Sequence, residues 1–208
     1  MRKTLAATVA VLLCCSTIFA QHTKEKLGFG FKAGVNVTTF RTAVDYSDFD
    51  PHLKLGQVFG AFAQVPLSSR FLVQPEFLYS QMGSGAHSTQ WGDVIFRYNY
   101  FSIPILVRYK VNGWLNVFAG PQFDLLIRAT QKQTNKVSTI TYGIQDFDFL
   151  YTAGVGTASK SWTFDLRYMH GSQDVSPDFG TTTFFNQGVQ ATVGYKLSKK
   201  TKKAKATN

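Results

Sequence analysis

Hydrophobicity that alternates along eight segments is the feature that most constrains the fold of this chain. Apolar residues recur at every second position from Leu27 onward, which is the period of a β-strand and not of a helix. The segments cover residues 28–37, 56–66, 71–82, 97–110, 115–127, 148–158, 162–171 and 186–197. Each segment is long enough for the roughly 9 to 11 residues that a tilted membrane strand needs.

The connections between these segments alternate strictly between short and long. The short connections cover residues 67–70, 111–114 and 159–161, and the long ones cover residues 38–55, 83–96, 128–147 and 172–185. Tight turns at one end and long loops at the other are typical of outer-membrane barrels, whose short turns face the periplasm. The pattern predicts an all-β fold, an eight-stranded antiparallel up-and-down transmembrane β-barrel.

The two faces of the segments differ in a way that favours a membrane barrel over a water-soluble sandwich. One face is apolar, as a lipid-facing surface would be. The other carries many glycines, which suit a narrow interior, and a few charges of both signs. These charges form a predicted lumen cluster of Lys32, Glu76, Arg108, Asp124, Asp165 and Arg167. Opposite charges in one lumen can pair with each other, as buried charges must; the alternative is charge scattered over a solvated surface.

The N-terminus has the layout of a cleaved secretory signal. A basic start at Arg2 and Lys3 precedes an apolar run, and small residues lead to Gln21. Both cysteines of the chain, Cys14 and Cys15, lie in this segment, so we expect a mature chain without thiolate metal sites or cysteine nucleophiles. The predicted organisation is a signal peptide at 1–20, an outer-membrane β-barrel domain at 21–197 and a basic, disordered periplasmic tail at 198–208.

The positive charge of the chain is concentrated at its two ends. Removing the leader lowers the formal charge from +10 to +8, and setting aside the five lysines between 199 and 205 leaves +3. The barrel itself is therefore nearly balanced, which argues against a nucleic-acid partner. A solvated tail is the simpler interpretation, and the alternative is attraction of the tail to an anionic envelope polymer or lipid headgroup.

Two histidines lie beside residues that could form a catalytic set at the rim of a barrel. His87 precedes Ser88, and His170 lies close to Asp174 and Asp178 in the sequence. Nothing in the spacing holds these side chains within the hydrogen-bond reach that catalysis requires. We therefore expect polar loops, no catalytic residue and no enzymatic activity.

The first long connection is the best candidate for a metal site. Asp45, Asp48 and Asp50 precede His52 there, and three acids could hold Ca²⁺ loosely. The connection lacks the glycine and the terminal glutamate of the standard calcium loop. We expect no metal and no cofactor, and the sequence assigns no ligand-binding residue.

Several stretches of the chain resemble the PorT-like outer-membrane β-barrel family. The most characteristic are VQPEFLYSQMG at 73–83 and FSIPILVRY at 101–109, the latter followed by Ala119-Gly120-Pro121. The opening strand and the last three segments are also similar, so the resemblance covers residues 27–197. It implies a small eight-stranded barrel in the outer membrane of a Gram-negative cell. The namesake of the family is associated with protein secretion, but shared structural motifs do not transfer that function.

The sequence therefore predicts an outer-membrane protein with a structural or interaction role in the cell envelope. The expected partners are outer-membrane lipid, the outer-membrane assembly machinery and an envelope protein or polymer. A narrow or gated solute pathway is one alternative, although eight strands enclose an interior only just wide enough for side chains. An accessory barrel in protein secretion is the other.

Overall fold

The computed structural model describes residues 27–42, 50–88, 92–133, 136–141, 144–159, 161–176 and 183–197. The predicted signal peptide at 1–20 and the predicted tail at 198–208 lie outside the described residues, as do Asp45, Asp48 and Asp178. The described part of the chain contains no helix that is long and apolar enough to cross a membrane.

Eleven strands make up the described structure, and they form a single sheet. They are β1 (Gly28–Thr42), β2 (Asp50–His52), β3 (Lys54–Pro66), β4 (Phe71–Met82), β5 (Gly85–Ser88), β6 (Gly92–Lys110), β7 (Leu115–Gln133), β8 (Lys136–Thr139), β9 (Phe147–Ala158), β10 (Trp162–Gly171) and β11 (Phe184–Leu197). The expected count of eight therefore covers only the long strands.

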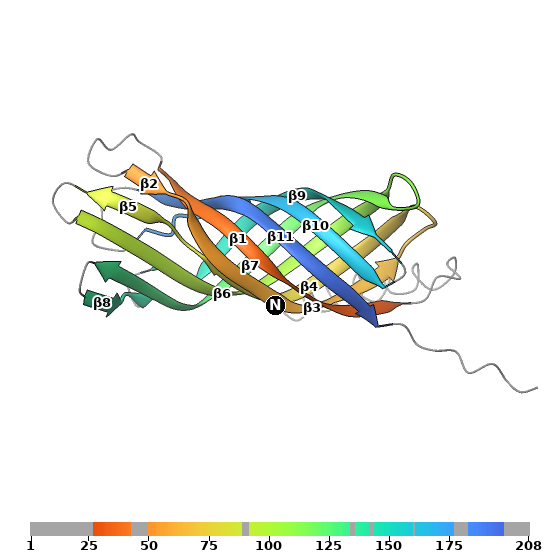
Figure 1. Ribbon diagram of the computed structural model, residues 1–208, viewed down its shortest axis with the longest axis horizontal. Coiled ribbons are helices and arrows are strands. Elements are labelled where there is room, and N and C mark those ends of the chain that lie inside the picture. Colours follow the sequence, from red (N-terminus) through yellow and green to blue (C-terminus); the bar gives the residue numbers. More distant parts are fainter. Residues whose placement is uncertain are drawn as a thin grey trace, which may run out of the picture.

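The long strands pair in a ring, and every pairing is antiparallel. Each pairs with the next long strand along the chain, and β11 returns to pair with β1 from Phe29↔Leu197 to Thr42↔Phe184. The short strands β2, β5 and β8 extend the sheet at the end of the molecule that carries the long connections (Figure 1). The predicted all-β, antiparallel, barrel-like fold is confirmed.

Several strands extend further toward the long connections than the sequence predicted. β1 continues to Thr42, β6 begins at Gly92, β7 runs to Gln133 and β11 begins at Phe184. In each extension, alternate side chains, among them Phe40 and Phe96, are buried inside the ring. Burial of these apolar side chains stabilises residues that had been interpreted as polar loop.

Inward and outward side chains alternate along the long strands, with a break in β7 after Ile127. On β4, for example, Leu72 and Leu78 are buried, whereas Phe71 and Phe77 on the other face are exposed. The exposed face carries an apolar belt around the ring, including Phe29 to Val37 on β1 and Val189 to Leu197 on β11. At the turn end of this belt, Trp162 contacts Tyr195 with ring centroids 5.1 Å apart. Aromatic residues at this level are typical of a membrane interface.

Gly60 lies where neighbouring strands approach too closely for a side chain. A Cβ atom at this position would overlap the Phe77 carbonyl oxygen and lie 2.8 Å from Leu78 Cα, both on the paired strand β4. Gly113, in the turn before β7, has nothing within 4 Å of a Cβ atom. The two positions therefore form a matched pair for testing how tightly the ring is closed.

We predict that Gly60→Ala lowers the free energy of unfolding by about 1 to 3 kcal/mol, because the added methyl group must displace backbone atoms. Gly113→Ala should change it by less than about 0.5 kcal/mol. Urea unfolding of the refolded protein in lipid vesicles measures both values. Equal stability of the two variants would contradict the packing described at Gly60.

Candidate functional site

The interior of the ring is the candidate functional site, because it gathers the six predicted charged side chains from five long strands. Lys32 comes from β1, Glu76 from β4, Arg108 from β6, Asp124 from β7 and both Asp165 and Arg167 from β10. All six predicted residues are buried on the inward face. They face inward because each occupies the alternate position to an outward apolar residue.

Five of these residues form one continuous set of ion pairs. Lys32 Nζ donates to Glu76 Oε1 at 2.6 Å and to Asp165 Oδ2 at 3.0 Å. Arg167 Nη1 donates to Glu76 Oε2 at 3.0 Å, and Arg108 Nη2 donates to Asp165 Oδ1. Each carboxylate is thus shared by two cations, which offsets the cost of removing the charges from water.

Neutral side chains hold the network in place. Gln74 Nε2 donates to Glu76 Oε1 at 2.6 Å, while Gln74 Oε1 accepts from Arg108 Nη1 at 3.2 Å. The guanidinium of Arg108 also lies over the Phe118 ring, 4.3 Å from its centroid, where it gains a cation–π interaction. The network is therefore rigidly built from side chains of several strands.

A glycine on β9 makes room for the Arg108–Asp165 pair. A Cβ atom at Gly156 would overlap Asp165 Oδ1 and lie 3.0 Å from Arg108 Nη2. Residue 156 pairs directly with Asp165 in the register of β9 and β10. The glycine-rich inward face noted in the sequence thus has a specific use here, because Gly156 leaves space for the charged groups of Arg108 and Asp165.

Asp124 lies apart from this network. In the part of the chain that the structure describes, its carboxylate accepts two hydrogen bonds from Gln122 Nε2, both at 3.0 Å, and no ion pair joins it to the other five residues. It lies opposite Asp148 on β9, whose Oδ2 accepts from Asn186 Nδ2 at 2.8 Å. The predicted cluster of six charges is thus five paired residues and one separate carboxylate.

A layer of apolar and aromatic side chains fills the interior at the long-connection end, and the sequence analysis did not identify it. Its buried members are Phe40, Met82, Val94, Phe96, Tyr98, Tyr100, Ala129, Ile144, Leu150, Met169, Val175 and Phe184. We call this set the apolar plug. Phe40 is its centre, since its ring lies 5.4 to 5.8 Å from the rings of Phe96, Tyr98 and Phe184.

The signal for the apolar plug was present in the sequence. Val94 and Phe96 continue the inward parity of Tyr98 and Tyr100 on β6 beyond the predicted start of that segment at 97. The Tyr98 side chain is 0% exposed and lies inside the ring. Extending the alternation into the long connection would have revealed the layer.

The candidate catalytic residues that the structure describes are not brought together, and Asp178 lies outside the described part of the chain. Asp174 Oδ1 accepts from the backbone N–H groups of Ser176 and Phe184, which makes it a loop-stabilising residue. The His170 ring lies 6.3 Å from the Tyr168 ring, in a tilted arrangement. His87 Nδ1 lies 2.7 Å from Asp93 Oδ1 in an exposed pair. Among the described residues, no group of three or more histidine, cysteine or acidic side chains could hold a metal ion.

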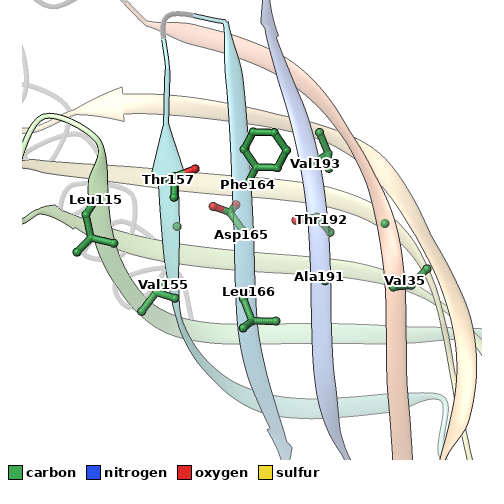
Figure 2. A pocket seen from close by; sticks show the side chains of 12 residues that line it. Val35, Leu115, Val155, Thr157, Phe164, Asp165, Leu166, Ala191, Thr192 and Val193 are labelled. Atoms are coloured by element: carbon green, nitrogen blue, oxygen red, sulfur yellow. The ribbon is translucent and has the colours of Figure 1, made fainter.

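Two hollows lie at the surface of the ring. One, of about 470 Å³, lies on the outward face of β9, β10, β11 and β1, where Figure 2 shows Val155, Phe164, Leu166 and Val193 around it. Its lining is almost entirely apolar, so it belongs to the lipid-facing surface. The other, of about 610 Å³, lies at the turn end and is bordered by Lys110, Asn116 and Lys196.

We predict that Glu76→Gln lowers the free energy of unfolding by about 3 to 5 kcal/mol, because it removes one of only two carboxylates that serve three buried cations. Adding Arg167→Gln should recover part of this loss, since that arginine pairs with Glu76. Urea unfolding of the two single variants and the double variant forms a double-mutant cycle. Losses that simply add would contradict the ion pair between Glu76 and Arg167.

Comparison with known proteins places this architecture in a family. Residues 19–176 match the model of the outer membrane protein beta-barrel domain. No curated protein matches the chain. Among solved structures, Neisserial surface protein A shares 12% identity with a TM-score of 0.55, over 83% of this chain and 100% of the other. The attachment invasion locus protein Ail of Yersinia pestis shares 9% identity over the same fractions, with a TM-score of 0.48.

The family match covers most of the barrel, and the antiparallel ring with its apolar outer belt agrees with it. The predicted location in the outer membrane is confirmed. The chain belongs to the outer membrane protein β-barrel domain family.

Proposed function

We propose that this protein is a closed barrel whose eight long strands span the outer membrane, and that it acts through its surfaces and not through its interior. The single observation that carries the proposal is the filling of the lumen by two successive layers. The ion-pair network of Lys32, Glu76, Arg108, Asp165 and Arg167 is one layer, and the apolar plug is the other.

The order of the two layers can be followed along β1. Its inward residues change from Lys32 through Asn36 and Thr38 to Phe40, that is, from charged through polar to aromatic. The middle level is also hydrogen-bonded, since Asn36 Nδ2 donates to Ser80 Oγ at 2.9 Å and Asn36 Oδ1 accepts from Gln190 Nε2 at 2.7 Å. A solute would have to disrupt the ion-pair network, this hydrogen-bonded level and the apolar plug in turn.

The membrane-spanning assignment rests on the outward belt. On β4 the apolar outward positions run from Phe71 to Tyr79, and on β6 they run from Tyr109 back to Phe101. Both stretches have the length of roughly 9 residues that a tilted strand needs to cross the hydrocarbon. We place the tight turns in the periplasm and the extended end with β2, β5 and β8 outside the cell, as outer-membrane barrels usually lie.

This arrangement favours an interaction role over the alternatives. Rigid barrels commonly carry their function on the variable end of the scaffold, and the extended strands provide a large surface there. No arrangement of described residues supports a catalytic set, so we propose that the protein is not an enzyme. Membership of the PorT-like branch, and with it a role as an accessory barrel in secretion, stays a prediction from the motifs at 73–83 and 101–109.

We predict that the refolded protein gives no steady conductance in a planar lipid bilayer, because both layers of the lumen are packed. Successful insertion is checked on the same preparation by gel mobility, since a folded membrane barrel migrates differently before and after boiling. A steady open channel formed by correctly folded protein would favour the solute pathway and overturn the proposal.

A further inference from the structure

A β-bulge in β7 gathers three cations on the outward face of the barrel. The pairing of β6 with β7 keeps one register from Lys110↔Asn116 to Tyr100↔Leu126 and then shifts by one residue, so that Asn99 pairs with Arg128. Ile127 is the inserted residue. Because a one-residue insertion moves every later side chain to the other face, Arg128, Thr130 and Lys132 face outward while Ala129 is buried in the apolar plug.

The bulge brings Arg128 and Lys132 next to Arg97 on the neighbouring strand. Arg97 lies opposite Thr130, so it is diagonal to both of the other cations, and diagonal positions in an antiparallel pair lie about 7 to 8 Å apart. All three side chains are exposed. We call these three residues the basic patch.

The charge of the basic patch is not neutralised within the described part of the chain. No acidic side chain there forms an ion pair with any of the three residues. Three like charges at this spacing repel one another. An external anion that binds between them would remove that repulsion.

The basic patch adjoins the apolar belt. The outward residues next to it toward the turn end are Phe101, Leu125 and Ile127, which are 39%, 46% and 54% exposed. Along the strands, toward the long-connection end, Arg97 lies four residues beyond Phe101 and Lys132 lies five residues beyond Ile127. On a strand tilted by about 45° this is a rise of roughly 10 Å, which spans the headgroup region of one leaflet.

We infer that the basic patch is a docking surface for the phosphate groups of an anionic lipid of the outer leaflet, whose fatty chains lie against Phe101, Leu125 and Ile127. Guanidinium groups bind phosphate through paired hydrogen bonds, which suits Arg97 and Arg128. Continuity with the belt favours a membrane lipid over a soluble anion, because an apolar surface and a cationic surface meet at one edge. The inference rests on the membrane-spanning arrangement proposed above.

The test uses the full refolded protein in phosphatidylcholine nanodiscs that contain diphosphoryl lipid A. The patch variant carries Arg97→Gln, Arg128→Gln and Lys132→Gln, and the control variant carries Lys199→Gln, Lys200→Gln and Lys202→Gln, an equal loss of charge in the tail. Native mass spectrometry measures the bound lipid A. We expect binding to fall by at least about tenfold in the patch variant, since each cation near an anionic surface contributes, and to stay unchanged in the control.

Two further measurements show whether the basic patch binds the phosphate of a lipid or free inorganic phosphate. The wild-type protein should bind monophosphoryl lipid A more weakly than the diphosphoryl form, and millimolar inorganic phosphate should not displace the lipid. Equal loss of lipid in both variants, or displacement by inorganic phosphate, would overturn the inference. Heat-dependent gel mobility of the same samples shows separately whether the barrel is folded. The experiment therefore distinguishes an error in the inferred lipid site from an error in the proposed membrane-spanning arrangement.

Discussion

The narrow interior of the strand ring is the constraint on which the rest of this structure depends. A ring of this size encloses only enough space for side chains, so inward residues must fit their neighbours and buried charges must be paired. Glu76 and Asp165 meet this requirement by sharing Lys32, and each also binds an arginine. Gly156 meets it by leaving space for the Arg108–Asp165 pair. The same narrowness that demands pairing also leaves no open route through the charged layer.

The ion-pair network and the apolar plug both fill the lumen, and they contribute to the structure in different ways. Buried ion pairs add little net stability but fix the relative position of the strands that supply them. The apolar plug contributes hydrophobic burial, with Phe40, Tyr98 and Tyr100 among its fully buried rings. It also anchors the extended ends of β6 and β7, whose outward faces carry the basic patch. The interior of the barrel thus supports the surface at which we expect the protein to act.

Much of this architecture could be predicted from alternation alone. The observed bounds of β4 and β10 are those predicted, because their alternation is regular and a tight turn precedes each of them. The ends of β1, β6 and β7 were missed because outward residues there are polar, as Arg41, Asp93 and Arg128 are, and such stretches resemble loops. Which lumen charges pair could not be foreseen, since Asp124 and Asp165 both face inward and only the strand register separates them. The bulge at Ile127 was also hidden, because Leu125, Leu126 and Ile127 are all apolar and alternation does not show where the extra residue lies.

Chemical access to the middle of the lumen tests the central claim most directly. Ser80 lies between the two layers and is 0% exposed, whereas Ser159 lies exposed in the turn after β9. In a chain with Cys14→Ser and Cys15→Ser, single Ser80→Cys and Ser159→Cys variants can be treated with a charged, membrane-impermeant thiol reagent. The closed lumen predicts rapid modification of Ser159→Cys and modification of Ser80→Cys only after unfolding. Equal rates in the folded protein would show that the lumen is open and would contradict the account.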